Sequence, residues 1–230
     1  MTGSILVTGG SKGIGLAIAR RFHAGGFAAT VCARNAATLA ALQRELPGLH
    51  AIECDVGDPA QVSAMVAQVR AQTGVPDILV NNAGTYLPGQ LHDEDDGVLE
   101  AMLRSNLFGA YRVTRGFLPG MMARKSGTIV NVCSTASIVP YVNGGSYCIA
   151  KHALHGFSKT LREEMKPHGV RVVALLPGAT LTASWEGVDL PPERFMPPED
   201  IAEIVWSACH VSPRTVVEDI LVRPMLGDIA

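Results

Sequence analysis

The sequence lacks an excess of either charge, and this absence excludes whole classes of partner. Its 230 residues include 19 Lys and Arg residues and 21 Asp and Glu residues, so the formal net charge at pH 7 is −2. A chain that binds nucleic acid or an anionic membrane through its general charge carries a basic excess or a basic stripe. We therefore expect neither nucleic acid nor membrane among its partners.

The 5 Cys residues show none of the spacings of a disulfide framework or a zinc site. Their number is odd, no Cys-x-x-Cys occurs, and most of them lie in apolar runs, where a thiol behaves as a small hydrophobic group. This use of cysteine favours a reducing compartment. His152 and His155 have the spacing of metal ligands on a helix, but no third ligand completes a known pattern, and we predict no metal site.

The sequence opens without a basic leader or a long apolar segment, because only the short apolar run at residues 5–7 follows Met1. A cytoplasmic protein is therefore expected. The longest span without a charged residue, 126–150, has the length of a membrane helix, but Asn131, Pro140, Asn143 and paired glycines interrupt it. We interpret it as a buried strand followed by the neutral wall of a cleft.

Short apolar runs alternate with segments of helical length along the whole chain. Runs that are apolar on both faces predict parallel strands covered by helices on both sides, which is the doubly wound α/β fold class. Ligands of such folds bind at the carboxyl ends of the strands. The expected strands are residues 5–8, 28–33, 50–54, 78–81, 128–133, 170–176 and 219–223.

The first expected strand runs directly into a glycine-rich turn. Gly9, Gly13 and Gly15 have the spacing Gly-x-x-x-Gly-x-Gly, and a helical pattern follows them. Such a turn directs backbone N–H groups and a helix N-terminus at a pyrophosphate. We predict that a dinucleotide cofactor binds at Gly9, Ser11, Lys12, Gly13, Ile14 and Gly15.

No carboxylate ends the second expected strand. An NAD site usually places Asp or Glu there, whereas this strand closes with Val31-Cys32-Ala33-Arg34 and the next acidic residue is Glu45. Arg34, together with Lys12 in the glycine turn, can instead bind a 2′-phosphate. The sequence therefore predicts NADP(H) in preference to NAD(H).

Tyr147 and Lys151 lie four residues apart in a helical pattern that continues through about Met165. This spacing places the phenol and the ammonium on one helix face. A tyrosine ordinarily loses its proton near pH ~10, but a nearby cation stabilises the phenolate and lowers the pKa. Such a tyrosine can exchange a proton with a carbonyl or alcohol oxygen. Many helices carry this pair on their surface, so its meaning depends on the rest of the chain.

Five motifs in order make the chain similar to the classical short-chain dehydrogenases/reductases over essentially its whole length. The resemblance implies a single-domain Rossmann-like fold over residues 1–230, with a seven-stranded parallel sheet. It also implies hydride transfer between a nicotinamide and a carbonyl or alcohol substrate, in a homodimer or homotetramer. The motifs are Thr8-Gly9-x-x-x-Gly13-x-Gly15, Asn81-Asn82-Ala83-Gly84, Ser134, Tyr147-x-x-x-Lys151 and Pro177-Gly178.

The resemblance also implies roles for individual residues. Tyr147 would be the general acid/base, Lys151 would lower its pKa and hold the nicotinamide ribose, and Ser134 would bind the substrate oxygen. Asn106 would position a water that links Lys151 to solvent. Asp55 either contacts the adenine or caps the following helix. The other implied cofactor contacts are Val56 beside Asp55, Asn81, Ala83 and Gly84 at the adenosine ribose, and Pro177, Gly178, Thr182 and, less favoured, Thr180 at the nicotinamide.

The longest irregular stretch, residues 183–198, holds four prolines and is expected to contact substrate. Prolines stiffen its ends, while Phe195 and Met196 have no regular element in the sequence to pack against. We therefore expect these two residues to close over a mainly apolar carbonyl or alcohol substrate, which Ser134, Tyr141 and Trp185 also contact.

Two other functions stay open. The first is 3-oxoacyl thioester reduction within the same family, against which stands the lack of a glycine-rich turn in the C-terminal segment 217–228. The second is a regulator that binds NADPH without catalysis. The segments 97–121 and 145–166 are expected to be long helices that pair subunits. The acidic run at residues 93–96 is interpreted as the solvated start of the first of these helices.

Overall fold

Seven parallel strands form one sheet in the computed structural model, which describes residues 3–185 and 187–229. The strand order is β3-β2-β1-β4-β5-β6-β7, so the direction of winding reverses between β1 and β4. All seven predicted strands are confirmed to within one residue at each end. They are β1 (Ser4–Thr8), β2 (Ala28–Ala33), β3 (His50–Glu53), β4 (Ile78–Asn81), β5 (Gly127–Val132), β6 (Val170–Pro177) and β7 (Asp219–Val222).

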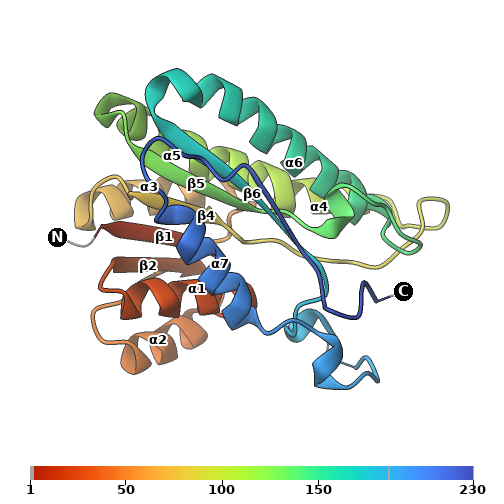
Figure 1. The fold of residues 1–230 in the computed structure, drawn as a ribbon. Coiled ribbons are helices and arrows are strands. Elements are labelled where there is room, and N and C mark those ends of the chain that lie inside the picture. The colour runs from red at the N-terminus through yellow and green to blue at the C-terminus, as the bar shows by residue number, and fades with distance from the viewer. Residues whose placement is uncertain (1–2, 186, 230) are drawn as a thin grey trace.

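Helices cover both faces of the sheet (Figure 1). On one face lie α1 (Gly13–Ala24), α2 (Ala36–Glu45) and α7 (Pro198–Cys209), and on the other lie α3 (Pro59–Gln72), α5 (Gly109–Arg124) and α6 (Gly145–Met165). A short α4 (Val98–Leu103) precedes α5. Single 3₁₀ turns occur at Thr135–Ser137, Lys166–His168, Ala183–Trp185 and Pro192–Arg194.

The core consists of two apolar layers, one on each side of the sheet. In β1, Ile5 and Val7 belong to the layer beneath α1 and α7, and Leu6 belongs to the layer beneath α3, α5 and α6. Successive side chains of a strand point to opposite faces, so a strand covered on both faces must be apolar at every position. This explains why the apolar runs predicted the strands correctly.

The predicted helix over residues 97–121 is interrupted. A π-helical turn, Arg104–Phe108, separates α4 from α5 and contains the buried Asn106. Such a turn widens the backbone by one residue and often marks a functional position. The other long helix was predicted correctly, since α6 ends at Met165.

The expectation that Phe195 and Met196 have nothing regular to pack against is wrong. They are 8% and 7% exposed, and Met196 belongs to the apolar layer beneath α1 and α7. The Met196 N–H donates to Ala179 O at 3.0 Å, and Leu181 N–H donates to Met196 O at 2.9 Å. The Phe195 ring packs on Trp185, with ring centres 5.1 Å apart. Glu186 of the same predicted loop lies outside the described residues.

Within residues 3–185 and 187–229, every helix is too short or too polar to cross a membrane. All 5 Cys residues are buried and free of disulfides.

Candidate active site

The glycine-rich turn lies between the end of β1 and the start of α1. Gly9 and Gly13 adopt φ values of +65° and +56°, which favour glycine, and Gly9 N–H donates to Cys32 O at 2.8 Å. The first turn of α1 has no acidic residue, and no side chain caps its N–H groups. An uncapped helix N-terminus of this kind attracts an anion.

Asn82 holds the glycine-rich turn in place. Its Nδ2 donates to Thr8 O at 3.0 Å and to Gly9 O at 3.1 Å, and a Cβ at Gly15 would collide with its side chain. Sequence reasoning named Asn82 within the Asn-Asn-Ala-Gly motif but did not count it among the site residues. Asn82 directly follows β4, which pairs with β1, and therefore lies at the carboxyl edge of the sheet, where ligands of this fold class bind. This position could have identified it as a site residue.

The side chain of Asn81 points into the core. Its Nδ2 donates to Thr114 Oγ1 at 2.9 Å and to Asn131 Oδ1 at 2.8 Å, and Asn131 in turn donates to Ser158 Oγ at 2.8 Å. Asn81 therefore ties β4 to α5 and β5. This geometry fits the predicted role in steadying the sheet, and it leaves only the Asn81 backbone to face a cofactor.

Two cations lie at the expected adenosine end. Lys12 is the N-cap residue of α1 and Arg34 directly follows β2; both side chains are exposed and make no hydrogen bond or ion pair with the described residues. Asp55 Oδ1 accepts from Gly57 N–H at 2.9 Å, whereas Asp58 is the residue that caps α3. The alternative that Asp55 caps this helix is therefore wrong, and the neighbouring Val56 is buried.

Ser134, Tyr147 and Lys151 come together at the carboxyl end of β5. Ser134 begins the 3₁₀ turn after β5, and its hydrogen bond with Tyr147 lowers the pKa of the phenol. Burial has the larger and opposite effect, and it raises the pKa of Tyr147 to about 12. Lys151 Nζ donates to Val132 O at 2.9 Å and lies 5.6 Å from the centre of the Tyr147 ring.

In this structure burial outweighs the effects that lower the pKa of Tyr147, so the role of Lys151 in lowering that pKa stays a prediction. Lys151 is itself buried, and loss of hydration lowers the pKa of its ammonium to about 8. The same burial that brings the two groups together thus disfavours the charged form of each. The sequence spacing gave the shared helix face correctly, but it contained no information on hydration.

Asn106 faces Lys151 across Gly84. Asn106 Nδ2 donates to Thr85 O at 2.9 Å and to Met102 O at 3.1 Å, while its buried Oδ1 has no partner among the described residues. A Cβ at Gly84 would collide with this oxygen and lie 3.7 Å from Lys151 Nζ. Glycine at position 84 therefore lets the amide oxygen and the ammonium approach the same space.

Thr182 and Thr180 differ in their surroundings. A Cβ at Gly13 would lie 3.1 Å from Thr182 Cγ2, so the segment after β6 lies against the glycine-rich turn. Thr180 is buried and its Oγ1 donates to Gly178 O at 3.1 Å, while Gly178 N–H donates to Val222 O at 2.8 Å. Thr182, whose side chain lies beside Gly13, therefore stays the favoured of the two threonines as a predicted cofactor contact.

Three of the 4 Tyr residues gather around the site. The rings of Tyr86 and Tyr147 meet edge to face with centres 5.0 Å apart, and Tyr86 Oη donates to Asn143 O at 3.3 Å. Tyr141 is partly exposed, and the partial burial of its hydroxyl together with the neighbouring tyrosines raises the pKa of Tyr141 above its ordinary range. Sequence reasoning missed Tyr86, although it stands two residues after Gly84 at the carboxyl edge of the sheet.

Glu94 corrects the interpretation of the acidic run as wholly solvated. Its carboxylate is half-buried and accepts from Ser146 N–H at 2.9 Å and from the Ser146 hydroxyl. The run also does not begin the helix, because α4 starts at Val98 behind Gly97. The histidines of α6 have separate partners, since His152 bonds to Cys148 O and His155 to Asp219 Oδ2, both at 2.8 Å.

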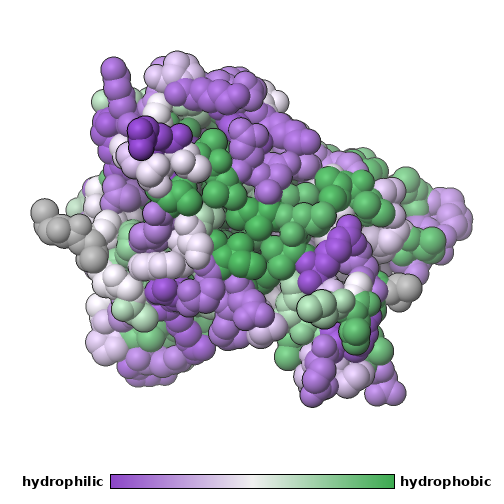
Figure 2. Space-filling model, viewed as in Figure 1, coloured by the Kyte–Doolittle hydropathy of each residue, from purple (hydrophilic) through white to green (hydrophobic). Residues whose placement is uncertain are grey.

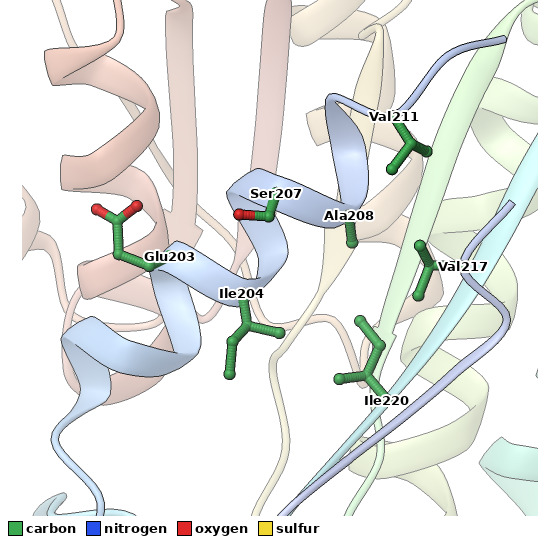
Figure 3. Close-up of a pocket in the computed structure, with 7 residues that line it drawn as sticks. All are labelled: Glu203, Ile204, Ser207, Ala208, Val211, Val217 and Ile220. Atoms are coloured by element: carbon green, nitrogen blue, oxygen red, sulfur yellow. The ribbon is translucent and has the colours of Figure 1, made fainter. Parts of the chain in front are cut away.

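Two cavities lie beside α7, away from these residues. One, of about 390 Å³, separates α7 from β7, and its lining side chains from the two segments face one another in Figure 3. The other, of about 580 Å³, includes Phe195, Met196 and Arg223. Figure 2 shows an apolar patch over the same region. None of the predicted catalytic residues lines either cavity.

Known proteins resemble this chain along most of its length. The family model described as short chain dehydrogenase matches residues 4–191. The NADP-dependent 3-hydroxy acid dehydrogenase YdfG of Salmonella typhi is 32% identical over 241 residues, covering 98% of this chain and 96% of that protein.

Solved structures share the fold. The closed form of serine dehydrogenase complexed with NADP⁺ has a TM-score of 0.91 and 32% identity, covering 98% of this chain and 96% of the other. Actinorhodin polyketide ketoreductase with NADPH has a TM-score of 0.90 and 30% identity, covering 99% and 98%.

Proposed function

The chain belongs to the short-chain dehydrogenase family of oxidoreductases, and from that premise we propose that it transfers a hydride between NADP(H) and a carbonyl or alcohol substrate. The observation that carries the proposal is the meeting of Ser134, Tyr147 and Lys151 at the end of β5, on the same edge of the sheet as the uncapped N-terminus of α1. This arrangement combines a proton donor with a place for a dinucleotide phosphate.

The residues present fit a dinucleotide cofactor. Gly9, Gly13 and the first turn of α1 would bind the pyrophosphate, with Thr182 on the opposite side. Arg34 and Lys12 would bind the 2′-phosphate, because both cations are exposed and without partners among the described residues. The NADP complexes of related structures support the same preference. When bound, the nicotinamide supplies or accepts the hydride.

Side chains of the protein itself would carry out the proton transfer. Ser134 would hold the carbonyl oxygen while Tyr147 donates its proton to that oxygen, and the Lys151 ammonium would stabilise the phenolate that remains. The free Oδ1 of Asn106 could accept from a water that carries a proton back toward Lys151. Proton transfer of this kind typically contributes ~10²–10⁴-fold to the rate. Burial raises the pKa of Tyr147, so the phenol is protonated at neutral pH and can donate a proton to a carbonyl oxygen.

Exposed apolar side chains in the segment that leads to Tyr147 support an apolar substrate. Between Ser134 and Tyr147 the chain exposes the apolar side chains of Ile138, Val139, Tyr141 and Val142. Tyr141 is therefore retained as a proposed substrate contact. Trp185 is half-buried against Phe195, so its proposed contact with substrate is limited to its free edge.

Reduction of a 3-oxoacyl thioester is the second candidate, and the similarity to a polyketide ketoreductase supports it. A single assay separates the possibilities: NADPH consumption with ketones, aldehydes, quinones and acyl thioesters. We expect turnover of at least one carbonyl class, and preference for the thioesters would establish the second candidate. Tight NADPH binding without turnover of any class would contradict the proposed function and favour a regulator.

We also propose that the protein forms a homo-oligomer in a reducing compartment. Phe108, Tyr111 and Ile149 expose apolar surface on the π-helical turn, α5 and α6, which suits pairing of subunits into a homodimer or homotetramer. Sedimentation analysis would measure the assembly. Five buried free thiols suit a reducing compartment such as the cytoplasm.

A further inference from the structure

The catalytic helix is held at its first turn by a residue from a distant segment. Glu94 accepts from Ser146 N–H at 2.9 Å and from the Ser146 hydroxyl, a contact between residues 52 positions apart. Ser146 immediately precedes Tyr147. The carboxylate therefore acts on the backbone that carries the proposed acid.

No residue of α6 can replace this contact. The N-cap residue, Gly144, has no side chain to bond with, and the first turn of α6 contains no acidic residue. The first N–H groups of a helix have no partner within the helix, and an acceptor with a negative charge there stabilises the helix start. Glu94 provides this acceptor from the segment between β4 and α4.

The backbone around the Glu94 carboxylate leaves room for it at the start of α6. Gly89 N–H donates to Asn143 O at 3.1 Å, and Gly89 forms a parallel bridge with Gly144. Gly145 has φ +23°, and a Cβ at this position would collide with Glu94 Oε1. A Cβ at Gly89 would lie 2.7 Å from Glu94 Cγ. Both glycines therefore leave room for Glu94 against the start of α6.

We propose that Glu94 is a positioning residue that fixes the first turn of α6 and so keeps the Tyr147 hydroxyl within hydrogen-bond reach of Ser134. The inference rests on the proposed function, because it concerns the orientation of the proposed acid. Ser134 and Tyr147 lie on separate segments, so their hydrogen bond depends on how α6 begins. A misplacement of about 1 Å in a catalytic group can cost ~10²-fold in rate.

Steady-state kinetics of four variants of the full chain test this role. Glu94→Ala is expected to lower kcat by about 10- to 100-fold while the Kd for NADPH changes less than about twofold. Glu94→Gln should recover most of the rate, since its amide oxygen can still accept from Ser146 N–H. Glu94→Asp should lose rate despite its charge, because its carboxylate is one methylene shorter. Asp96→Ala, which removes the same charge from an exposed neighbour, is the matched control and should behave as the wild type.

Hydrogen exchange of the first-turn amides of α6, which requires no turnover, separates this inference from the proposed function. Faster exchange in Glu94→Ala and Glu94→Asp, but not in Asp96→Ala, supports the anchoring. Unchanged exchange in both Glu94→Ala and Glu94→Asp overturns the inference, whatever their activity. A kcat of Glu94→Ala within about twofold of the wild type also overturns it. A Glu94→Gln variant as slow as Glu94→Ala overturns it too. Absence of turnover in the wild type, with faster exchange in the variants, would contradict only the proposed chemistry.

Discussion

Lys151 Nζ lies 5.6 Å from the centre of the Tyr147 ring, and burial shifts the pKa values of the two groups in opposite directions. The pKa of Tyr147 is raised to about 12, and the pKa of Lys151 is lowered to about 8. At pH 7 both groups therefore retain their protons. The phenol is the form that can protonate a carbonyl oxygen, and the ammonium is the form that can stabilise the resulting phenolate.

Carbonyl reduction should therefore slow as the pH rises through about 8. Above this value Lys151 loses its charge, and the neutral amine no longer stabilises the phenolate or donates as strongly to the cofactor. The rate falls rather than rises with pH because the Lys151 ammonium is present below about pH 8 and is lost above it. A profile of kcat between about pH 6 and about pH 10 measures the effect. A rate that stays constant to the alkaline end would contradict it.

NADPH should bind about ten- to a hundredfold more tightly than NADH, because charge-assisted contacts to one phosphate contribute ~1.5–3 kcal/mol. Arg34→Asp should reverse much of this preference by replacing a cation with a carboxylate that accepts from ribose hydroxyls. Fluorescence titration with both cofactors gives the dissociation constants. Arg44→Asp, on the exposed face of α2, is a matched control for the change of charge. Equal affinities of the wild type for the two cofactors would exclude the predicted role of Arg34.

Asn82→Ala should weaken both the fold and cofactor binding. It removes two hydrogen bonds to the glycine-rich turn, each contributing about 0.5–1.5 kcal/mol, and it frees the backbone that would bind the pyrophosphate. Urea unfolding and NADPH titration measure the two effects. Thr73→Ala is the control, because it removes one hydrogen bond at the end of α3, to Val69 O at 3.2 Å, and should cost about 0.5–1.5 kcal/mol of stability without changing NADPH affinity. NADPH affinity equal in the two variants would show that Asn82 is only structural.

Phe195→Ala should lower the free energy of unfolding by about 3–5 kcal/mol, because the ring is buried against Trp185. The sequence-based expectation, that Phe195 closes over the substrate, would instead place the main effect of this change on KM. Urea unfolding measures the change, and Leu190→Ala, at an exposed position of the same loop, is the control. A stable variant with a raised KM would restore the original interpretation.

The sequence predicted those features that depend on local pattern. The strands were placed correctly because a parallel sheet buried on both faces leaves continuous apolar runs, as in β1. The four-residue spacing of Tyr147 and Lys151 correctly predicted that they share a helix face, because residues four apart are neighbours on a helix. The family resemblance supplied Ser134, whose contact with Tyr147 crosses from one segment to another.

Features that depend on contacts between distant segments were missed. The π-helical turn at Asn106 accompanies a hydrogen bond to Thr85, 21 residues earlier, and Glu94 contacts Ser146 across 52 residues. The burial of Phe195 and Met196 depends on pairing with the segment after β6. The pKa values of Tyr147 and Lys151 depend on hydration, which is known only once the surrounding elements are placed.

The Tyr147 hydroxyl is the proposed acid of a hydride-transfer enzyme, and Tyr147→Phe removes this hydroxyl alone. The substitution removes one oxygen from a half-buried ring and leaves the glycine-rich turn, Arg34 and Lys151 unchanged. Turnover of a carbonyl substrate accepted by the wild type should fall by ~10²–10⁴-fold or more, while the Kd for NADPH changes little. Turnover close to that of the wild type would contradict the account, because another group would then supply the proton.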